Sequence, residues 1–335
     1  MLAVFGTTPA GDTVHRISLR KGPLRAEVLT LGGIVQDLRL DGVPFPLVLG
    51  AESVEPYFGA LRYCGGIVGR FANRISGGRF TVDGQSFDLS RNFLGKHTLH
   101  GGAQGSDVML WSVAEQSDSH VRLELTLPEG HMGFPGTLAV TVTITLTDEC
   151  ALAFDITATT TSPTPCALAH HGYFNLDGGD DITGHRLQVL AERYTPVDDE
   201  LIPDGPVRAV AETRFDFRQP QMIGWDGIDH NFCLSDTRRP LTPVARLWAA
   251  HSGLSMQVET TEPGLQVYDG GYLYVPDPVG LGGRRYGPNA GLALEAQAWP
   301  DAPNRPDFPD AILRPGQTYH QTTHYRFFPP QEARP

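Results

Sequence analysis

The sequence predicts an all-β protein, a large antiparallel β-sandwich with few short helices. Two stretches carry this prediction, because residues 121–127 and 138–147 alternate between large apolar side chains and mostly polar ones, as strands do when one face is buried. The 38 glycines and 27 prolines indicate many turns, and helical periodicity is nearly absent. No internal repeat or linker divides the chain, so we expect a single domain over residues 1–335.

The expected strands follow one another along the chain. The first lie between residues 16 and 40, and the Asp-Gly pair at 83–84 predicts a hairpin with a two-residue turn. The alternating strands at 121–127 and 138–147 lead to a return strand at 152–158. Further strands are expected at 243–250, at 254–261, around Gln266, and at 312–328, the last as an edge or closing strand.

The composition excludes some classes of partner. The formal net charge is −12, and nucleic-acid binding needs a basic surface instead. The four cysteines are widely spread, which predicts neither a zinc ribbon nor a dense disulfide framework. No apolar run approaches the about 20 residues that cross a membrane, and the first residues lack the features of a signal peptide. We therefore expect a cytoplasmic protein that contacts neither nucleic acid nor membrane.

The stretch 292–304 is the first candidate for chemistry. An apolar run at 292–294 is typical of a buried strand, and Glu295 then places a carboxylate at the expected strand end. The Trp-Pro pair at 299–300 cannot continue a central strand, because proline supplies no N–H group. Since a buried carboxylate is costly unless it is paired or protonated, Glu295 is either a general base in a pocket or the partner of a structural arginine such as Arg305.

Four histidines occur in two clusters beside glycines. His97 and His100 precede a Gly-Gly pair without any helical pattern, so we interpret His100 as a hydrogen-bonding loop residue. His170 and His171 point to opposite faces if they lie on a strand. One of them then enters a pocket, where imidazole can act as an acid near neutral pH, or both are buried structural residues.

Three more polar residues are candidates for a binding site, and each also has a structural interpretation. Asn73 and Arg74 lie in the glycine-bounded loop 65–78, which lacks the GK[ST] of a phosphate loop. The guanidinium of Arg74 can bind a sugar or a carboxylate, or it can bind backbone carbonyls. Asp229 is an acceptor for sugar hydroxyls, a partner that orients a histidine, or an Asx-turn residue.

Six motifs of this chain resemble those of the aldose 1-epimerases, or galactose mutarotases. In chain order they occupy residues 69–78, 99–102, 170–176, 229–234, 295–304 and 314–327. The resemblance runs from about Phe5 to Phe328, and six motifs in order are highly specific. It implies the large antiparallel β-sandwich of that family, the galactose mutarotase-like supersandwich, which agrees with the strands expected above.

The resemblance also implies an activity and a site. The family interconverts the α and β anomers of a free hexose such as galactose or glucose by acid–base ring opening and closure, with no metal or other cofactor. Glu295 matches the catalytic base and His171 the catalytic acid. The positions that match sugar-binding residues are Asn73, Arg74, His100, Asp229 and Gln266. We expect Glu295 to be ionised and His171 protonated in the resting enzyme, because each favours the charged form of the other.

Three positions depart from the family pattern. His170 stands where relatives usually have asparagine, and Gly172 where they often have serine. Residues 269–271, Asp-Gly-Gly, replace the usual Thr-Gly-Asn. None of these is the acid or the base, so the departures bear on sugar preference. The expected partner is a monosaccharide, and the expected assembly is a monomer or a homodimer.

Three alternative functions stay open at this point. A glycoside hydrolase would use Asp229 and Glu295 as its acid–base pair, with carboxyl groups about 5–5.5 or 6.5–9.5 Å apart, but it leaves the histidines without a role. A non-catalytic sugar-binding module would keep the polar and aromatic residues without needing the glutamate. A cupin-like metal enzyme would take its ligands from the histidines at 97, 100, 170 and 171.

Overall fold

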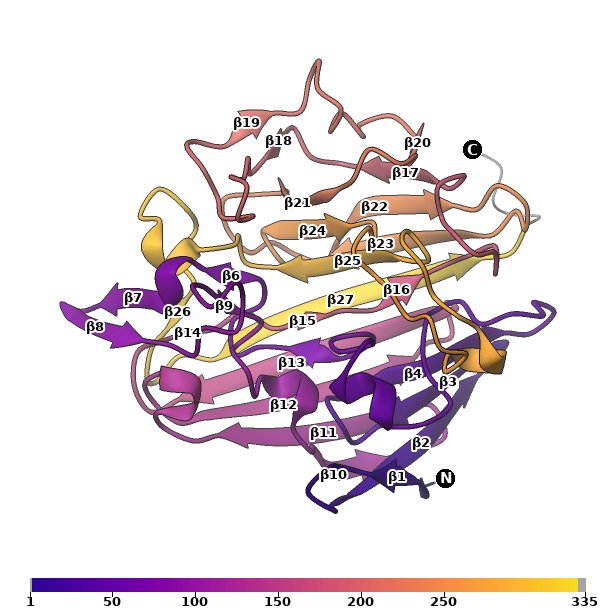
Figure 1. Ribbon diagram of the computed structural model, residues 1–335, viewed down its shortest axis with the longest axis horizontal. Helices are drawn as coiled ribbons and strands as arrows, with labels where there is room; N and C mark the ends of the chain where they lie inside the picture. The colour runs from indigo at the N-terminus through magenta and orange to yellow at the C-terminus, as the bar shows by residue number, and fades with distance from the viewer. Residues whose placement is uncertain (1, 331–335) are drawn as a thin grey trace.

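The computed structural model describes residues 2–330 and confirms the all-β fold (Figure 1). Its largest sheet has nine strands, and every neighbouring pair is antiparallel. In spatial order the strands are β10 (Ser112–Gln116), β11 (His120–Leu127), β12 (Leu138–Leu146), β13 (Ala151–Thr160), β27 (Tyr319–Phe328), β23 (Ser255–Thr260), β22 (Thr242–Trp248), β17 (Arg186–Val189) and β20 (Gln221–Met222).

The last strand of the chain lies in the middle of this sheet. β27 pairs with β13 on one side and with β23 on the other, so its interpretation as an edge strand is wrong and its interpretation as a closing strand is right. Its side chains alternate between buried and half-buried or exposed, a pattern that an edge strand and a central strand share when one sheet face is covered. The pattern alone therefore could not separate the two positions.

Two further sheets cover the inner face of the large sheet. One has six strands, in the order β16 (Tyr173–Phe174), β25 (Leu292–Gln297), β24 (Gly264–Tyr268), β21 (Asp229–Cys233), β18 (Arg193–Tyr194) and β19 (Arg208–Ala209). The other is a meander of β1 (Leu2–Thr7), β2 (Thr13–Lys21), β3 (Leu24–Leu29) and β4 (Val35–Leu40). Buried side chains from all three sheets form one apolar core, so the architecture is the expected sandwich.

Polar side chains also join the two layers. The Tyr325 hydroxyl on β27 donates to the carbonyl of Leu294 at 2.9 Å, and the Gln321 amide donates to the carbonyl of Ala296 at 2.9 Å. Both carbonyls belong to β25. Strand β25 is therefore held against the centre of the nine-stranded sheet as well as by its own neighbours.

The remaining elements are short. Four two-stranded ladders pair β14 (Thr164–Pro165) with β26 (Ile312–Leu313), β15 (Ala169–His170) with β5 (Ile67–Val68), β6 (Arg74–Ile75) with β9 (Thr98–Leu99), and β7 (Arg79–Val82) with β8 (Gln85–Asp88). The 3-10 helices are η1 (Glu55–Phe58), η2 (Ser76–Gly78), η3 (Ser106–Val108), η4 (His131–Gly133), η5 (Leu281–Gly283) and η6 (Ala302–Asn304). Among residues 2–330 no helix has the length and apolar character needed to cross a membrane.

The hairpin expected at 83–84 is confirmed. Asp83 and Gly84 join β7 to β8 with φ values of 50° and 78°. Two consecutive positive φ values define the type I′ turn, whose twist matches that of the flanking strands.

Strand β25 is buried on both faces, and this places its carboxylate. Leu292, Leu294 and Ala296 belong to the core of the sandwich, so the side chain of Glu295 points to the opposite face of the sheet. The strand continues to Gln297, which corrects the expectation that Glu295 ends it. The strand thus ends two residues later than expected, just before the Trp-Pro pair at 299–300.

Candidate active site

The ladder register of the six-stranded sheet places polar side chains side by side. Glu295 on β25 pairs with Gln266 on β24, and Gln266 pairs with Asn231 on β21. Directly opposed residues share one face of a sheet, and Asp229 lies on that face too, two residues before Asn231. His171 precedes β16, the strand on the other side of β25, and so lies beside Glu295. One sheet face thus carries a carboxylate between an imidazole and an amide.

A second group comes from the loops that flank β6 and β9. Asn73 and His100 form two hydrogen bonds with each other, from the Asn73 N–H to His100 Nδ1 at 3.1 Å and from the His100 N–H to the Asn73 carbonyl at 3.0 Å. Their φ values are 64° and 50°, a region that few non-glycine residues adopt. A Cβ at the next residue, Gly101, would lie 1.9 Å from the carbonyl oxygen of Gly69. Only glycine permits this close approach, which fixes the direction of the His100 ring.

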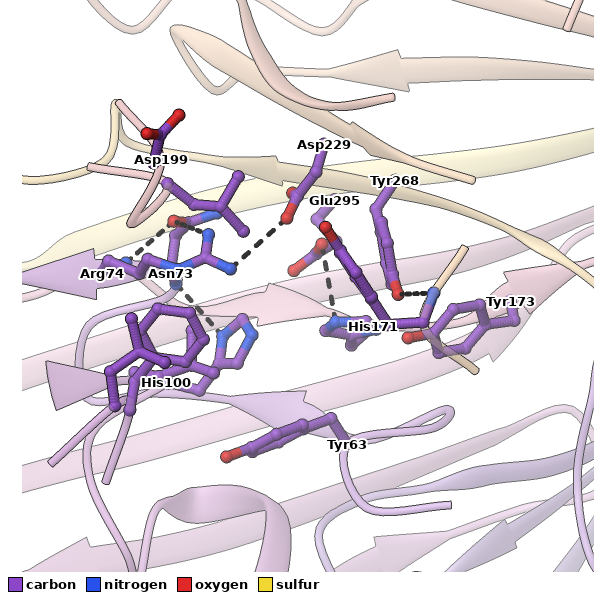
Figure 2. A pocket seen from close by; sticks show the side chains of 15 residues that line it. Tyr63, Asn73, Arg74, His100, His171, Tyr173, Asp199, Asp229, Tyr268 and Glu295 are labelled. Atoms are coloured by element: carbon purple, nitrogen blue, oxygen red, sulfur yellow. Dashed lines mark hydrogen bonds and ion pairs between the residues drawn. The ribbon is translucent and has the colours of Figure 1, made fainter. Parts of the chain in front are cut away.

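Both groups meet at one cavity of about 530 Å³ (Figure 2). Six of the seven expected site residues line it, namely Asn73, Arg74, His100, His171, Asp229 and Glu295. The seventh, Gln266, lies behind the wall and donates its amide to Asp229 Oδ1 at 2.5 Å. The interpretation of Asp229 as an Asx-turn residue is not supported, because its carboxylate accepts from Gln266 and Arg74 side chains.

Arg74 is held on three sides. Its guanidinium lies 3.3 Å from Asp229 Oδ2 and 3.3 Å from Asn73 Oδ1, and 4.5 Å above the centre of the Phe93 ring. These contacts favour the interpretation in which Arg74 binds a carboxylate over the one in which it binds backbone carbonyls. A guanidinium fixed in this way presents its remaining N–H groups to the cavity in one orientation.

Several residues of the wall, which come from loops and from strand ends, were not predicted as site residues. They are Tyr63, Phe93, Leu94, Leu99, Tyr173, Asp199, Leu201, Tyr268 and Tyr272. The rings of Tyr63 and Tyr173 lie 6.1 and 5.1 Å from the His171 ring. The acid candidate thus lies between two aromatic rings, which restrict its rotation.

Glu295 and His171 face each other in the cavity, with His171 Nε2 at 3.6 Å from Glu295 Oε1 (Figure 2). Glu295 Oε2 has no hydrogen-bond partner among the described residues although it is buried. Burial raises the pKa of Glu295 well above its usual value, with a smaller contribution from Asp229. Burial also lowers the pKa of His171, to about 4. An unsatisfied carboxylate oxygen in a cavity is a position where a ligand donor is expected.

These shifts contradict the expected resting state with an ionised Glu295 and a protonated His171. Both residues are almost fully buried, and removal from water disfavours each charged form. Desolvation is the largest cause of both shifts, and it opposes the mutual attraction on which the expectation rested. Burial therefore favours the two groups in their neutral forms.

The hydrogen bond between Asn73 and His100 determines which ring nitrogen of His100 carries the proton. Because His100 Nδ1 accepts the Asn73 N–H, the neutral ring carries its proton on Nε2. Burial, with His171 as the next cause, holds the pKa of His100 well below its usual range. His100 therefore presents an N–H donor to the cavity, which suits a sugar oxygen.

The same observation bears on metal binding. Side-chain ligand atoms of His100, His171 and Glu295 lie within 4.8 Å of one another. A histidine ligand needs a free lone pair, however, and His100 has one nitrogen occupied as an acceptor and the other protonated. The four-histidine ligand set of a cupin-like enzyme is not formed either, because His97 binds Glu200 and the ring of His170 stacks on Phe154 in the core at 4.3 Å.

The antiparallel β-sandwich thus holds a cavity in which a buried carboxylate faces an imidazole, an arrangement suited to acid–base catalysis. The family model described as aldose 1-epimerase matches residues 15–326, and the chain belongs to this family. It is 39% identical to the galactose mutarotase of Rattus norvegicus over 339 aligned positions, which cover 97% of each chain. It is 38% identical to the aldose 1-epimerase of Escherichia coli K12, with 95% of this chain and 96% of that protein covered.

Solved structures agree with these relatives. The crystal structure of a GalM/aldose epimerase homologue from C. elegans matches with a TM-score of 0.87 and 31% identity, and covers 94% of this chain and 98% of the other. The galactose 1-epimerase of Lactobacillus acidophilus matches with a TM-score of 0.84 and 26% identity over 98% of both chains. The expected family, fold and enzyme class, an isomerase, are thereby confirmed.

Proposed function

We propose that this protein is a mutarotase that interconverts the α and β anomers of a free hexose such as galactose or glucose. The observation that supports this most directly is the pair formed by Glu295 and His171, buried and 3.6 Å apart in a cavity. Mutarotation needs one proton taken from the C1 hydroxyl and one delivered to the ring oxygen. A carboxyl group and an imidazole side by side can exchange these roles.

Glu295 acts as the base and His171 as the acid in ring opening. The Glu295 carboxylate takes the proton of the C1 hydroxyl, a C1=O double bond forms, and the C1–O5 bond breaks as O5 takes a proton from His171. The aldehyde then rotates about the C1–C2 bond. In ring closure His171 removes the O5 proton, O5 attacks the other face of C1, and O1 recovers its proton from Glu295. Each such group typically contributes about 10²–10⁴-fold to the rate.

The pKa shifts support a specific energetic role for burial. After ring opening, Glu295 carries a proton and His171 has lost one, so both are neutral. Burial raises the pKa of Glu295 and lowers that of His171, and each shift favours this neutral pair. Burial of the pair therefore stabilises the enzyme form that accompanies the open-chain aldehyde, and it destabilises the charged pair from which ring opening starts.

The other polar residues of the cavity bind and orient the sugar. His100 donates from Nε2, as its bond with Asn73 requires. Arg74 donates and Asp229 accepts, and Gln266 acts from behind the wall by fixing Asp229. Asn73 adds an amide at the cavity wall. A pyranose presents hydroxyl groups that both donate and accept, so this mixed set of partners suits a neutral sugar.

The alternative functions receive less support. A glycoside hydrolase would need Asp229 free as an acid or base, but this carboxylate is engaged with Arg74 and Gln266. A sugar-binding module would not need a buried carboxylate with an unsatisfied oxygen beside an imidazole. A cytoplasmic location, a monomeric or homodimeric state and the absence of nucleic-acid and membrane partners stay predictions from the sequence.

Polarimetry with freshly dissolved α-D-galactose and α-D-glucose tests the proposal. The wild type should accelerate the decay of optical rotation, and Glu295→Gln should reduce kcat about 100-fold or more. Glu259→Gln is a matched control, because Glu259 is a partly buried glutamate on β23 outside the cavity. Equal rates for wild type and Glu295→Gln would remove Glu295 as the base. Binding of galactose without acceleration would point to a sugar-binding module.

A further inference from the structure

One carboxylate joins two loops at the cavity. Glu200 Oε2 accepts a hydrogen bond from Lys96 Nζ at 2.5 Å and another from His97 Nε2 at 3.0 Å. Glu200 belongs to the turn 198–202, and its two partners belong to the turn 93–97. Each turn contributes side chains to the cavity wall, Leu201 from the first and Leu94 from the second. We call this three-residue contact the clasp.

The orientation of His97 is specific for the clasp. His97 Nδ1 accepts the N–H of Gly77 at 2.9 Å, so the proton of the neutral ring is on Nε2 and points to Glu200. The ring is 2% exposed, and its backbone forms two hydrogen bonds with Phe93 that close the turn, at 3.0 and 2.9 Å. These contacts fix the His97 ring in the orientation in which it donates to Glu200.

The turn that carries Glu200 is also rigid. The carboxylate of Asp198 accepts the backbone N–H groups of Glu200 and Ile202 at 2.9 and 3.0 Å. At its base, Arg305 donates to the carbonyls of Pro203 at 3.4 Å and Gly205 at 2.7 Å. Movement of this turn as one body is thus opposed at its base by Arg305 and at its tip by the clasp.

A short chain of contacts leads from the clasp to the sugar site. His97 and Phe93 are joined through their backbones, and the Phe93 ring supports the guanidinium of Arg74 at 4.5 Å. Arg74 in turn binds Asp229. The position of Arg74 in the cavity therefore depends on the turn 93–97, which the clasp holds against the turn 198–202.

We propose that Glu200, with Lys96 and His97, is a positioning element of the active site that holds the two turns together and so fixes Arg74 and the apolar rim for sugar binding. This inference rests on the proposed mutarotase function, because it assigns the clasp an effect on the sugar complex. None of the three residues lines the cavity, so none acts on the sugar directly. The expected effect is on KM rather than on the acid–base step at Glu295 and His171.

Steady-state kinetics with α-D-galactose separate this role from a merely structural one. Glu200→Ala should raise KM about three-fold or more, as expected for loss of a partly exposed ion pair with a hydrogen bond, with a smaller change in kcat. Glu200→Gln keeps an acceptor for His97 and should recover part of the loss. Lys21→Met is the control, because Lys21 forms an ion pair with Asp148 away from the cavity. An unchanged KM in Glu200→Ala would overturn the proposal.

A spectroscopic readout tests the clasp without activity. Lys21 and Lys96 are the only lysines of the chain, so reductive methylation with ¹³C-formaldehyde gives one dimethyl-lysine resonance for each. Glu200→Ala should shift the Lys96 resonance and leave the Lys21 resonance in place, and galactose should shift Lys96 in the wild type. A Lys96 resonance that responds to neither change would refute the clasp. Absence of mutarotation by the wild type would instead refute the proposed function, whatever the lysine spectra show.

Discussion

Gly172 and His170, the two departures that flank His171, occupy the same space. A Cβ built at Gly172 would lie 2.3 Å from Cε1 and 3.0 Å from Nε2 of the His170 ring. The ring has little freedom to retreat, because it stacks on Phe154 at 4.3 Å and lies edge-on to Tyr325 at 5.5 Å. We therefore predict that Gly172→Ser destabilises this protein.

The expected size follows from the clash and the length of the chain. Overpacking a closed site costs about 1–3 kcal/mol. An unfolding entropy of about 2.1 cal/mol/K per residue gives about 0.7 kcal/mol/K for 335 residues. Gly172→Ser should thus lower Tm by about 1.4–4 °C. It should also lower kcat, because a shift of the backbone between residues 170 and 172 would displace the ring of His171.

The double variant His170→Asn/Gly172→Ser tests the cause. Asparagine removes the ring atoms that clash, so the two changes together should cost about 1 kcal/mol less than the sum of the single changes. Thermal unfolding of the four proteins, followed by circular dichroism, measures this coupling, and polarimetry measures the recovery of kcat. Additive effects, or a Gly172→Ser protein as stable as the wild type, would refute the argument from the shared space.

Three further predictions concern charge and metal. The raised pKa of Glu295 means that its ionised form is disfavoured in the folded state. Glu295→Gln should therefore raise Tm at pH 8 by about 1–3 °C while it reduces kcat about 100-fold or more, and a lower Tm would contradict the assignment. The pKa values of His170 and His171 fall to about 3 and about 4, so the unfolded chain binds their protons first, and these two groups lower stability as pH falls from about 6.5 towards 4. The raised pKa of Glu295 acts in the opposite direction over this range, so the contribution of the histidines is measured as a difference. Urea unfolding at pH 7 and pH 5 should show that His170→Asn loses less stability, or gains more, on acidification than the wild type does. Dialysis against EDTA should leave mutarotation unchanged, because His100 has no free lone pair for a metal. A loss of activity on dialysis that added Zn²⁺ restores would contradict this prediction.

The sequence predicted the scaffold well where periodicity is strong. The alternating stretches within 121–158 form strands β11, β12 and β13. An alternating strand has only one apolar face, so it can lie in a sandwich in only one way, with that face against the core. The central position of β27 was not predictable, since strand order depends on partners far apart in the chain. Periodicity describes one strand at a time and contains no information about its neighbours.

The active site, like the fold, was predictable from the sequence only in part. Residue types and motif order pointed to Glu295, His171 and the polar residues around them, and the structure brings them together. The aromatic and apolar wall, such as Phe93 and Leu201, lies on loops whose paths depend on distant contacts. The pKa shifts of the acid–base pair oppose the predicted charge states, because the sequence contains the attraction between two side chains but not the depth at which they are buried.

The central place of β27 has a consequence for the time at which the enzyme becomes active. Residues 319–328 come after every other strand of the large sheet in the sequence, yet among the described strands they alone connect β13 to β23. They also anchor β25, the strand of Glu295, through Tyr325 and Gln321. Until these residues are released, the two halves of the large sheet expose unpaired strand edges. Completion of the sheet and assembly of the acid–base pair therefore coincide, and both wait for the synthesis of β27.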